Sequence, residues 1–124
     1  EGYGKVSWAV RTIYESYGGW FQFLSTTELY PFDPTSVDAE VVELAGGAAA
    51  VAALARDRLE AGGDVSAVRL AEMALAADAD NRAALEVYLA AHRSLLAGGG
   101  EDNFWEAGWL RQQIERVKEK LGPD

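Results

Sequence analysis

Runs of glycine divide this sequence into segments that have the length of a helix. They stand at Gly18-Gly19, Gly46-Gly47, Gly62-Gly63 and Gly98-Gly99-Gly100. Glycine tolerates the left-handed conformation that ends many helices, and most segments between these runs repeat apolar residues at steps of three and four. The sequence therefore predicts an all-α fold, with about five or six helices in a compact helical array.

Capping residues and prolines predict where these helices begin and end. Pro31 and Pro34 exclude a continuous helix between residues 22 and 36, so we expect an extended passage over the surface there. Side chains that cap helix N-termini precede most of the other segments. The expected helices span about 7–17; from a cap at Thr35 or Ser36 to about Ala45; 47–61; 65–77 after Asp64; from Asp80 or Asn81 to Gly98; and from Asp102 or Asn103 to Gly122-Pro123.

Each expected helix carries one apolar stripe, which we predict to face the core. The last helix is unusual, because Trp105 and Trp109 lie off its stripe and would form a second apolar face. The stripes are Val10, Ile13, Tyr14 and Tyr17; Val37, Val41 and Leu44; Val51, Leu54, Ala55, Arg58 and Leu59; Val68, Ala71 and Leu75; Ala84, Tyr88, Ala91 and Leu95; and Phe104, Ala107, Leu110, Ile114, Val117 and Leu121.

Length and charge limit what the chain can be. Its 124 residues suit one helical domain spanning 1–124, and no apolar run is long enough to cross a membrane. A net charge of −9, spread along the chain, argues against a nucleic-acid partner. The first residue is Glu1 and no leader follows it. We therefore expect a piece of a longer protein, from a compartment that the sequence leaves open.

The residues available for chemistry are few. His92 is the single histidine and there is no cysteine, so the chain cannot assemble a zinc site of the usual type, and we expect His92 to have a structural role. None of the glycine runs matches a phosphate-binding loop. The carboxylates at Asp33, Asp38, Glu40 and Glu43 lack the spacing of a calcium loop, and we expect them on a solvated helix face. The sequence thus predicts a helical module that has no cofactor and no active site of its own.

Two groups of aromatic residues require an explanation, and two explanations stay open. One group is Tyr14, Tyr17, Trp20, Phe21 and Phe23, and the other is Phe104, Trp105 and Trp109. The rings could pack against one another in the core. Alternatively they could meet a partner, because tryptophan and tyrosine favour interfaces and large exposed aromatic patches are uncommon on monomers.

One helical hairpin resembles a tetratricopeptide-type repeat. It comprises the sequence "AGGDVSAVRLAEMALAADADNRAALEVYLAAHRSLLAGG", with small residues where paired helices would touch and a turn near 78–81. A second repeat of this kind is at most degenerate. The hairpin therefore suggests a tetratricopeptide-like peptide-binding module as an alternative function.

Several motifs, taken in order, resemble those of a known enzyme domain. They are "GYGKVSWAVRTIYESYGGWF", "ELAGG", "LEAGGDVSAVRLAEMALAADADNRAA" and "NFWEAGWLRQQI". Over nearly its whole length the chain is similar to the helical dimerisation domain of alkyl sulfatases that have a metallo-β-lactamase-like catalytic domain. Family members open the first helix with Ser-His-Asn, where this chain has Ser7-Trp8-Ala9.

The resemblance implies a role in a larger hydrolase of sulfuric esters. Such an enzyme binds two zinc ions in a separate catalytic domain, which would be a partner within the same polypeptide, and its helical domain pairs the subunits as a homodimer. The resemblance implies a dimer interface that includes Tyr14, Tyr17, Trp20, Phe21, Trp105 and Trp109. It also implies that Ser7, Trp8 and Arg11 could form part of the wall of the substrate pocket. No zinc ligand is expected in this chain.

Overall fold

The computed structural model of the chain describes residues 25–99 and 103–122. The chain divides into two units, Glu1–Pro34 and Thr35–Asp124. In the first unit, the described residues form one short 3-10 turn, η1 (Thr26–Leu29), followed by residues 30–33 without helix. The helix expected at 7–17 lies outside the described residues. The second unit contains all the helices discussed below.

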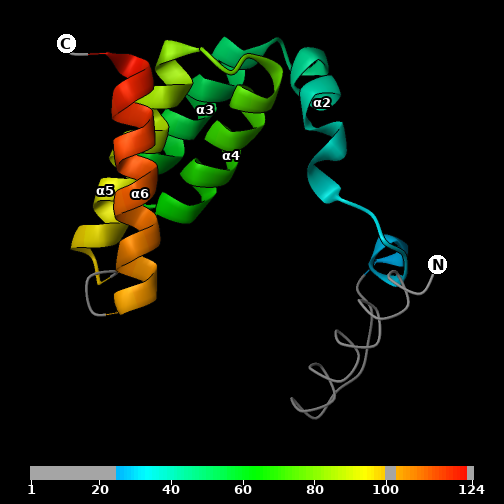
Figure 1. Cartoon of the computed structure of the whole chain (residues 1–124). Coiled ribbons are helices and arrows are strands. Elements are labelled where there is room, and N and C mark those ends of the chain that lie inside the picture. Colours follow the sequence, from blue (N-terminus) through cyan, green and yellow to red (C-terminus); the bar gives the residue numbers. More distant parts are fainter. Residues whose placement is uncertain (1–24, 100–102, 123–124) are drawn as a thin grey trace. The chain divides into compact units, whose positions relative to one another are not determined.

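Within the described residues there are five α-helices, two 3-10 turns and no strand, which confirms the predicted all-α fold. Figure 1 shows the helices of the second unit as an array of neighbouring rods. A second turn, η2 (Pro34–Val37), leads directly into the first of them. The helices are α2 (Asp38–Leu44), α3 (Ala48–Glu60), α4 (Asp64–Ala77), α5 (Arg82–Ala97) and α6 (Phe104–Leu121).

The helices of the second unit pack mainly on their neighbours in sequence. Helix α3 packs on α4, α4 on α5 and α5 on α6, while α5 also contacts α3 and α2 lies against α4. Helix α6 has α5 as its main packing partner and lies at one side of the array (Figure 1). Among the described residues of this unit, one flank of α6 is therefore left exposed.

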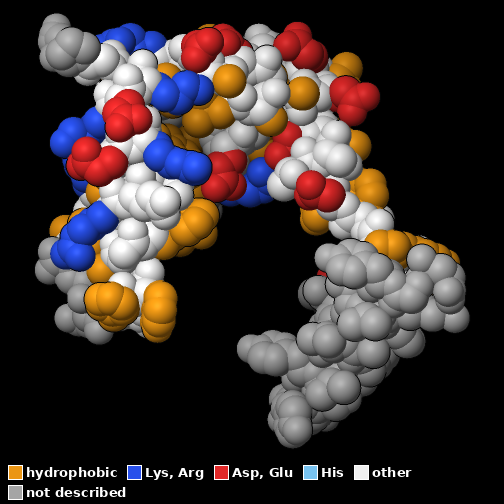
Figure 2. All heavy atoms as spheres, viewed as in Figure 1, with side chains coloured by type: hydrophobic (Ala, Val, Ile, Leu, Met, Phe, Trp, Pro, Cys, Tyr) orange, Lys and Arg blue, Asp and Glu red, His pale blue; other side chains and the backbone are white. Residues whose placement is uncertain are grey.

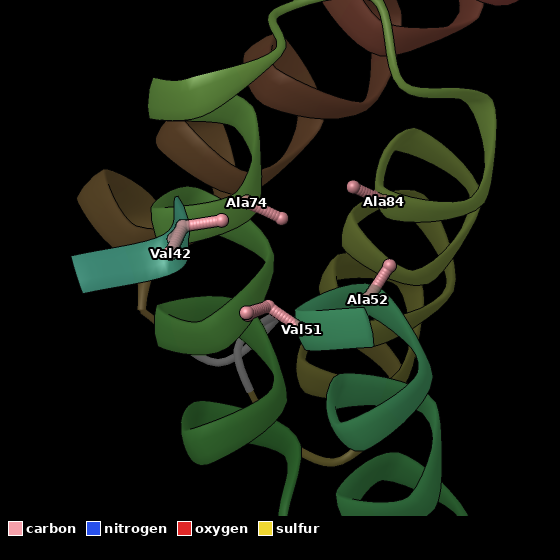
Figure 3. Close-up of a cluster of buried hydrophobic side chains, with 5 residues drawn as sticks. All are labelled: Val42, Val51, Ala52, Ala74 and Ala84. Carbon is pink, nitrogen blue, oxygen red and sulfur yellow. The ribbon is translucent and has the colours of Figure 1, made fainter. Parts of the chain in front are cut away.

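Two clusters of buried residues in the core consist of small side chains. Figure 3 shows one cluster, in which Val42 of α2 meets Val51 and Ala52 of α3, Ala74 of α4 and Ala84 of α5. A second cluster joins α3, α4 and α5 through Ala55, Ala67, Val87 and Ala91. Because alanine adds little bulk between two backbones, these helices can pack closely and exclude water with few large residues.

Local capping follows the expectations from sequence at two helices. The Asn81 side chain accepts a hydrogen bond from the Ala84 backbone N–H at 2.9 Å, and the Asn103 side chain accepts one from Glu106 at 2.9 Å. These asparagines, and not Asp80 or Asp102, are the N-caps. Each bond satisfies one of the free N–H groups of a first helical turn.

The prediction for α2 was wrong in its cap and in its buried face. Thr35 and Ser36 lie in η2, and Val37 is the N-cap residue. The predicted inward residues Val37, Val41 and Leu44 are exposed. Asp38 and Val42 are buried instead.

The reason for the changed face is a contact with a distant helix. Arg69 on α4 donates two hydrogen bonds to the Asp38 carboxylate, at 2.8 and 2.9 Å. This pair turns Asp38 inward, and Val42, one helical turn later, enters the core with it. The sequence analysis expected Asp38 on a solvated helix face, and this expectation was wrong, because the Asp38 side chain is buried.

The inward stripes of the other helices are largely as predicted. The predicted residues Val51, Ala55, Ala71, Ala84, Ala91, Ala107, Leu110, Ile114 and Val117 are buried. Leu54 and Arg58 on α3 are exposed, and so is Phe104. The predicted stripes did not include Ala52, Ala67, Ala74, Leu85 and Val87, which are also buried. The three alanines were missed because alanine marks a buried face only weakly in an alanine-rich sequence, and Leu85 and Val87 lie beside the predicted stripe of α5.

Candidate functional site

Helix α6 has one face in the core and one in solvent. Its buried residues are Ala107, Leu110, Gln113, Ile114 and Val117. Asn103 caps its start, and its end is tied to the rest of the unit by the Lys120 ammonium, which donates to the Ala79 carbonyl at 2.8 Å. The buried side chains and the Lys120 bond thus fix the orientation of α6, so most of the remaining side chains of the helix point into solvent.

Three aromatic side chains lie exposed on the first two turns of α6. Phe104 is 80% exposed, Trp105 81% and Trp109 59%. The rings of Phe104 and Trp105 meet edge to face, with centroids 5.4 Å apart. In Figure 2, hydrophobic side chains gather at this end of α6, at the lower left. We call Phe104, Trp105 and Trp109 the α6 aromatic face.

Gly108 lies among these rings. A helix brings residues three and four apart onto one face, so Phe104 and Trp105 lie one turn before Gly108, and Trp109 follows it. A Cβ atom added at Gly108 would meet no heavy atom within 4 Å in the described part of the chain. The aromatic face therefore surrounds a position without a side chain.

Polar and charged residues surround the α6 aromatic face. Glu106 lies in the same turns of α6, and Arg111, Gln112 and Glu115 follow, all of them exposed. The Lys118 ammonium lies 3.5 Å from the Glu115 carboxylate, farther along the helix. An apolar centre with a polar rim is the usual arrangement of a protein–protein interface.

A shallow groove of about 420 Å³ lies beside α6. Leu75, Leu85 and Val117 provide apolar lining, and Tyr88 and Arg116 provide polar groups. Gln113 also lines it, and the Gln113 side-chain nitrogen is buried without a hydrogen-bond partner among the described residues. Gln113 stands four residues after Trp109, so the groove adjoins the α6 aromatic face.

The pKa of Tyr88, which lines this groove, is raised. Burial raises the pKa of the Tyr88 phenol above its usual value, the nearby Glu72 carboxylate raises it further, and the Arg116 guanidinium opposes them. The phenol therefore stays neutral to a higher pH than a tyrosine in water. As a neutral hydroxyl it can donate or accept a hydrogen bond at the edge of the groove.

The described residues do not fit a zinc site. They contain no group of three or more histidine, cysteine, aspartate or glutamate side chains that could hold a metal ion. His92 is buried, and its Nδ1–H donates to the Tyr88 carbonyl at 2.8 Å while the two rings lie 4.1 Å apart. His92 is thus a packed residue of α5, in the structural role expected of it.

The residues predicted for a functional site fall into two sets. Trp105 and Trp109 are brought together on one exposed face, and their place in an interface stays a prediction. The others lie outside the described residues: Tyr14, Tyr17, Trp20 and Phe21 of the predicted interface, and Ser7, Trp8 and Arg11 of the predicted pocket wall.

Sequence reasoning missed two features of this surface. The one available signal for Gly108 was that a glycine stands inside a helical pattern, and the sequence analysis did not use it. Gln113 was missed because a single polar residue beside an apolar stripe does not reveal whether it is buried. A further exposed apolar residue, Leu44 on α2, is 89% exposed and lies on another helix.

In the described part of the chain, no helix has both the length and the apolar composition needed to span a bilayer. Comparison with protein families matches residues 1–115 to the family model described as "Alkyl sulfatase dimerisation". A search of curated proteins and a search of solved structures each found no match.

Proposed function

We propose, since the chain belongs to the alkyl sulfatase dimerisation family, that it joins two identical subunits through the α6 aromatic face. Membership of the family makes the chain a dimerisation domain and implies association of like chains. The proposal adds that the α6 aromatic face is the surface through which the two chains associate. The observation that carries it is the exposure of Phe104, Trp105 and Trp109 on one side of a helix that packs mainly on α5.

The size of the aromatic face supports this assignment. Aromatic side chains bury roughly 150–250 Å² each, so three largely exposed rings offer on the order of 400 Å². A stable interface takes about 800 Å² from each partner. The α6 aromatic face would supply about half of that area. We propose that Tyr14, Tyr17, Trp20 and Phe21 contribute to the remainder.

A two-fold dimer suits a surface of this composition. In such a dimer the same patch of each chain meets its own copy, so it must be self-complementary. The α6 aromatic face carries no charge at its centre, so two copies can meet there without burying like charges.

We further propose that the parent protein is a sulfuric ester hydrolase and that its zinc ions are held by a metallo-β-lactamase-like domain elsewhere in the polypeptide. This is in keeping with the donor set here, where His92 is buried and no metal cluster is found among the described residues. The domain would pair catalytic units, and Ser7, Trp8 and Arg11 would line part of the substrate pocket. The net charge of −9 supports our expectation of no nucleic-acid partner.

The test is the association state of the 124-residue chain by analytical ultracentrifugation at micromolar concentration. We expect a dimer for the unaltered chain. The Trp105→Ala/Trp109→Ala variant should raise the dimer Kd by at least about 30-fold, because two central aromatic contacts are lost. Leu44→Ala is the matched control, since it removes an exposed apolar side chain from another helix and should leave the Kd unchanged.

Circular dichroism must show that all variants keep their helix content. A monomeric unaltered chain would contradict dimerisation through this domain alone. A dimer that is insensitive to the double substitution would place the interface elsewhere.

A second candidate function has one observation in its favour. The groove beside α4, α5 and α6 has an apolar lining and the polar groups of Tyr88 and Arg116, which are features that a tetratricopeptide-like peptide-binding module would use. A monomeric chain whose Tyr88 and Gln113 NMR signals shift on addition of an extended peptide library would support that alternative.

A further inference from the structure

Gly108 occupies a helix position where the described residues of the chain give glycine no advantage. It is the fifth residue of the 18-residue helix α6, and glycine is the least favourable residue in a helix interior after proline. It is exposed and does not have the positive φ that makes glycine necessary at helix ends. A Cβ there would have open space around it.

The explanation for Gly108 must therefore lie outside the described contacts of the chain. A helical glycine that no described residue of its own chain requires allows another backbone or a large ring to approach the helix closely. The position of Gly108 is informative, because Phe104, Trp105 and Trp109 surround it on the same two turns. The surface thus combines large protruding rings with a position that lacks a side chain.

From this geometry we infer that Gly108 is the point of closest approach between the α6 helices of two paired chains, where a tryptophan ring of one chain packs over Gly108 of the other. This inference rests on the proposed dimerisation through the α6 aromatic face. The inference adds that Gly108 determines how closely the two α6 helices approach one another. This distance in turn determines how much of each aromatic ring is buried in the dimer.

A second copy of this chain is the partner that fits. A two-fold axis passing near Gly108 would bring the rings of each chain over the glycine of the other, so one patch supplies both halves of the contact. The family description independently calls for pairing of like chains. Close approach also matters energetically, because dispersion contacts decline steeply once surfaces separate by an ångström or less.

The inference predicts opposite effects of one substitution on folding and on association. Gly108→Ala should stabilise the single chain, because alanine is a better helix residue and its methyl group meets no heavy atom of the described residues within 4 Å. The same methyl group should hold the two helices apart. We expect the dimer Kd to rise by about 10-fold for Gly108→Ala and by 100-fold or more for Gly108→Leu.

Two measurements separate these effects. Thermal unfolding is measured in the Trp105→Ala/Trp109→Ala background, where association is removed, and Gly108→Ala should raise Tm by about 2–6 °C. Sedimentation equilibrium of the single Gly108 variants gives the dimer Kd. Ala53→Leu is the matched control, because Ala53 is exposed on α3 and not on α6, so the added bulk should change the Kd by less than threefold.

Each outcome decides between the two proposals. A higher Tm together with weaker association supports close approach at Gly108. If the unaltered chain dimerises and Gly108→Ala associates equally well or more tightly, the inference is wrong while the proposed function stands. A lower Tm for Gly108→Ala would show that glycine serves the fold of the single chain and would also overturn the inference. An unaltered chain that is monomeric contradicts the proposed function itself.

Discussion

At the scale of single residues, Tyr88 shows how partial burial changes the chemistry of a side chain. Its phenol lies where burial and the Glu72 carboxylate both oppose ionisation, and the pKa is raised in the folded chain. The unfolded chain places the same phenol in water, where it ionises near pH 10. Folding and protonation of Tyr88 are therefore linked.

This linkage predicts a loss of stability at high pH. Because the folded-state pKa is above the unfolded value, the contribution of Tyr88 is fully present below about pH 10 and is lost as the pH rises through the folded pKa. The difference in unfolding free energy between the unaltered chain and Tyr88→Phe should thus shrink from pH 9 to pH 11. Urea denaturation at each pH measures it, with Tyr30→Phe as the control because Tyr30 is exposed. A constant difference would show that the folded chain does not perturb Tyr88.

At the scale of elements, α2 depends on a contact with another helix. A helix of seven residues is too short to be stable alone, and the apolar side chains Val41 and Leu44 of α2 face solvent. What holds it are Val42 in the core and the double hydrogen bond from Arg69 to the buried Asp38. An ion pair with α4 and the burial of Val42 among α3, α4 and α5 thus attach the short helix to the array.

Removing Arg69 should therefore release α2 before the rest of the array. In Arg69→Ala the Asp38 carboxylate stays buried without its guanidinium partner, and we expect a loss of about 1–3 kcal/mol in unfolding free energy. Amide hydrogen exchange should accelerate in Asp38–Leu44 more than in α3 to α6. The control is Arg56→Ala, which removes an exposed arginine from α3. Equal exchange in α2 of the two variants would mean that Val42 alone holds the helix.

At the scale of the whole molecule, charge opposes the pairing that the apolar surface favours. Each chain carries a formal net charge of −9, so two chains repel one another before their apolar surfaces meet. Salt screens this repulsion, because the Debye length falls from about 30 Å at 0.01 M to about 8 Å at 0.15 M ionic strength. Association through an uncharged aromatic centre should then strengthen.

We expect the dimer Kd to fall severalfold when sodium chloride is raised from 10 to 150 mM, measured by sedimentation equilibrium at pH 7. The physical reason is reduced repulsion between two acidic chains, whereas burial of aromatic surface changes little over this range. Sucrose at matched osmolality serves as the control for effects that do not depend on charge. A Kd that rises with salt would indicate that ion pairs, and not the α6 aromatic face, provide most of the attraction.

The sequence by itself determined the features that depend on near neighbours in the chain. Helix type and most helix ends were predictable, since the caps at Asn81 and Asn103 bond to backbone groups three residues away. The separation of Trp105 and Trp109 from the buried stripe of α6 follows in the same way from helical spacing.

Only the tertiary structure decided which surfaces are covered. Arg69 and Asp38 are 31 residues apart in sequence, and their contact turned α2 away from the face that its own apolar pattern favoured. Phe104 belongs to the buried stripe by spacing, yet it is exposed on the first turn of α6. The open space around Gly108 and the burial of Gln113 likewise depend on which helices pack against α6. Burial is a property of the assembled helices. Spacing along one helix specifies on which side of the helix a side chain lies, but not whether another helix packs on that side.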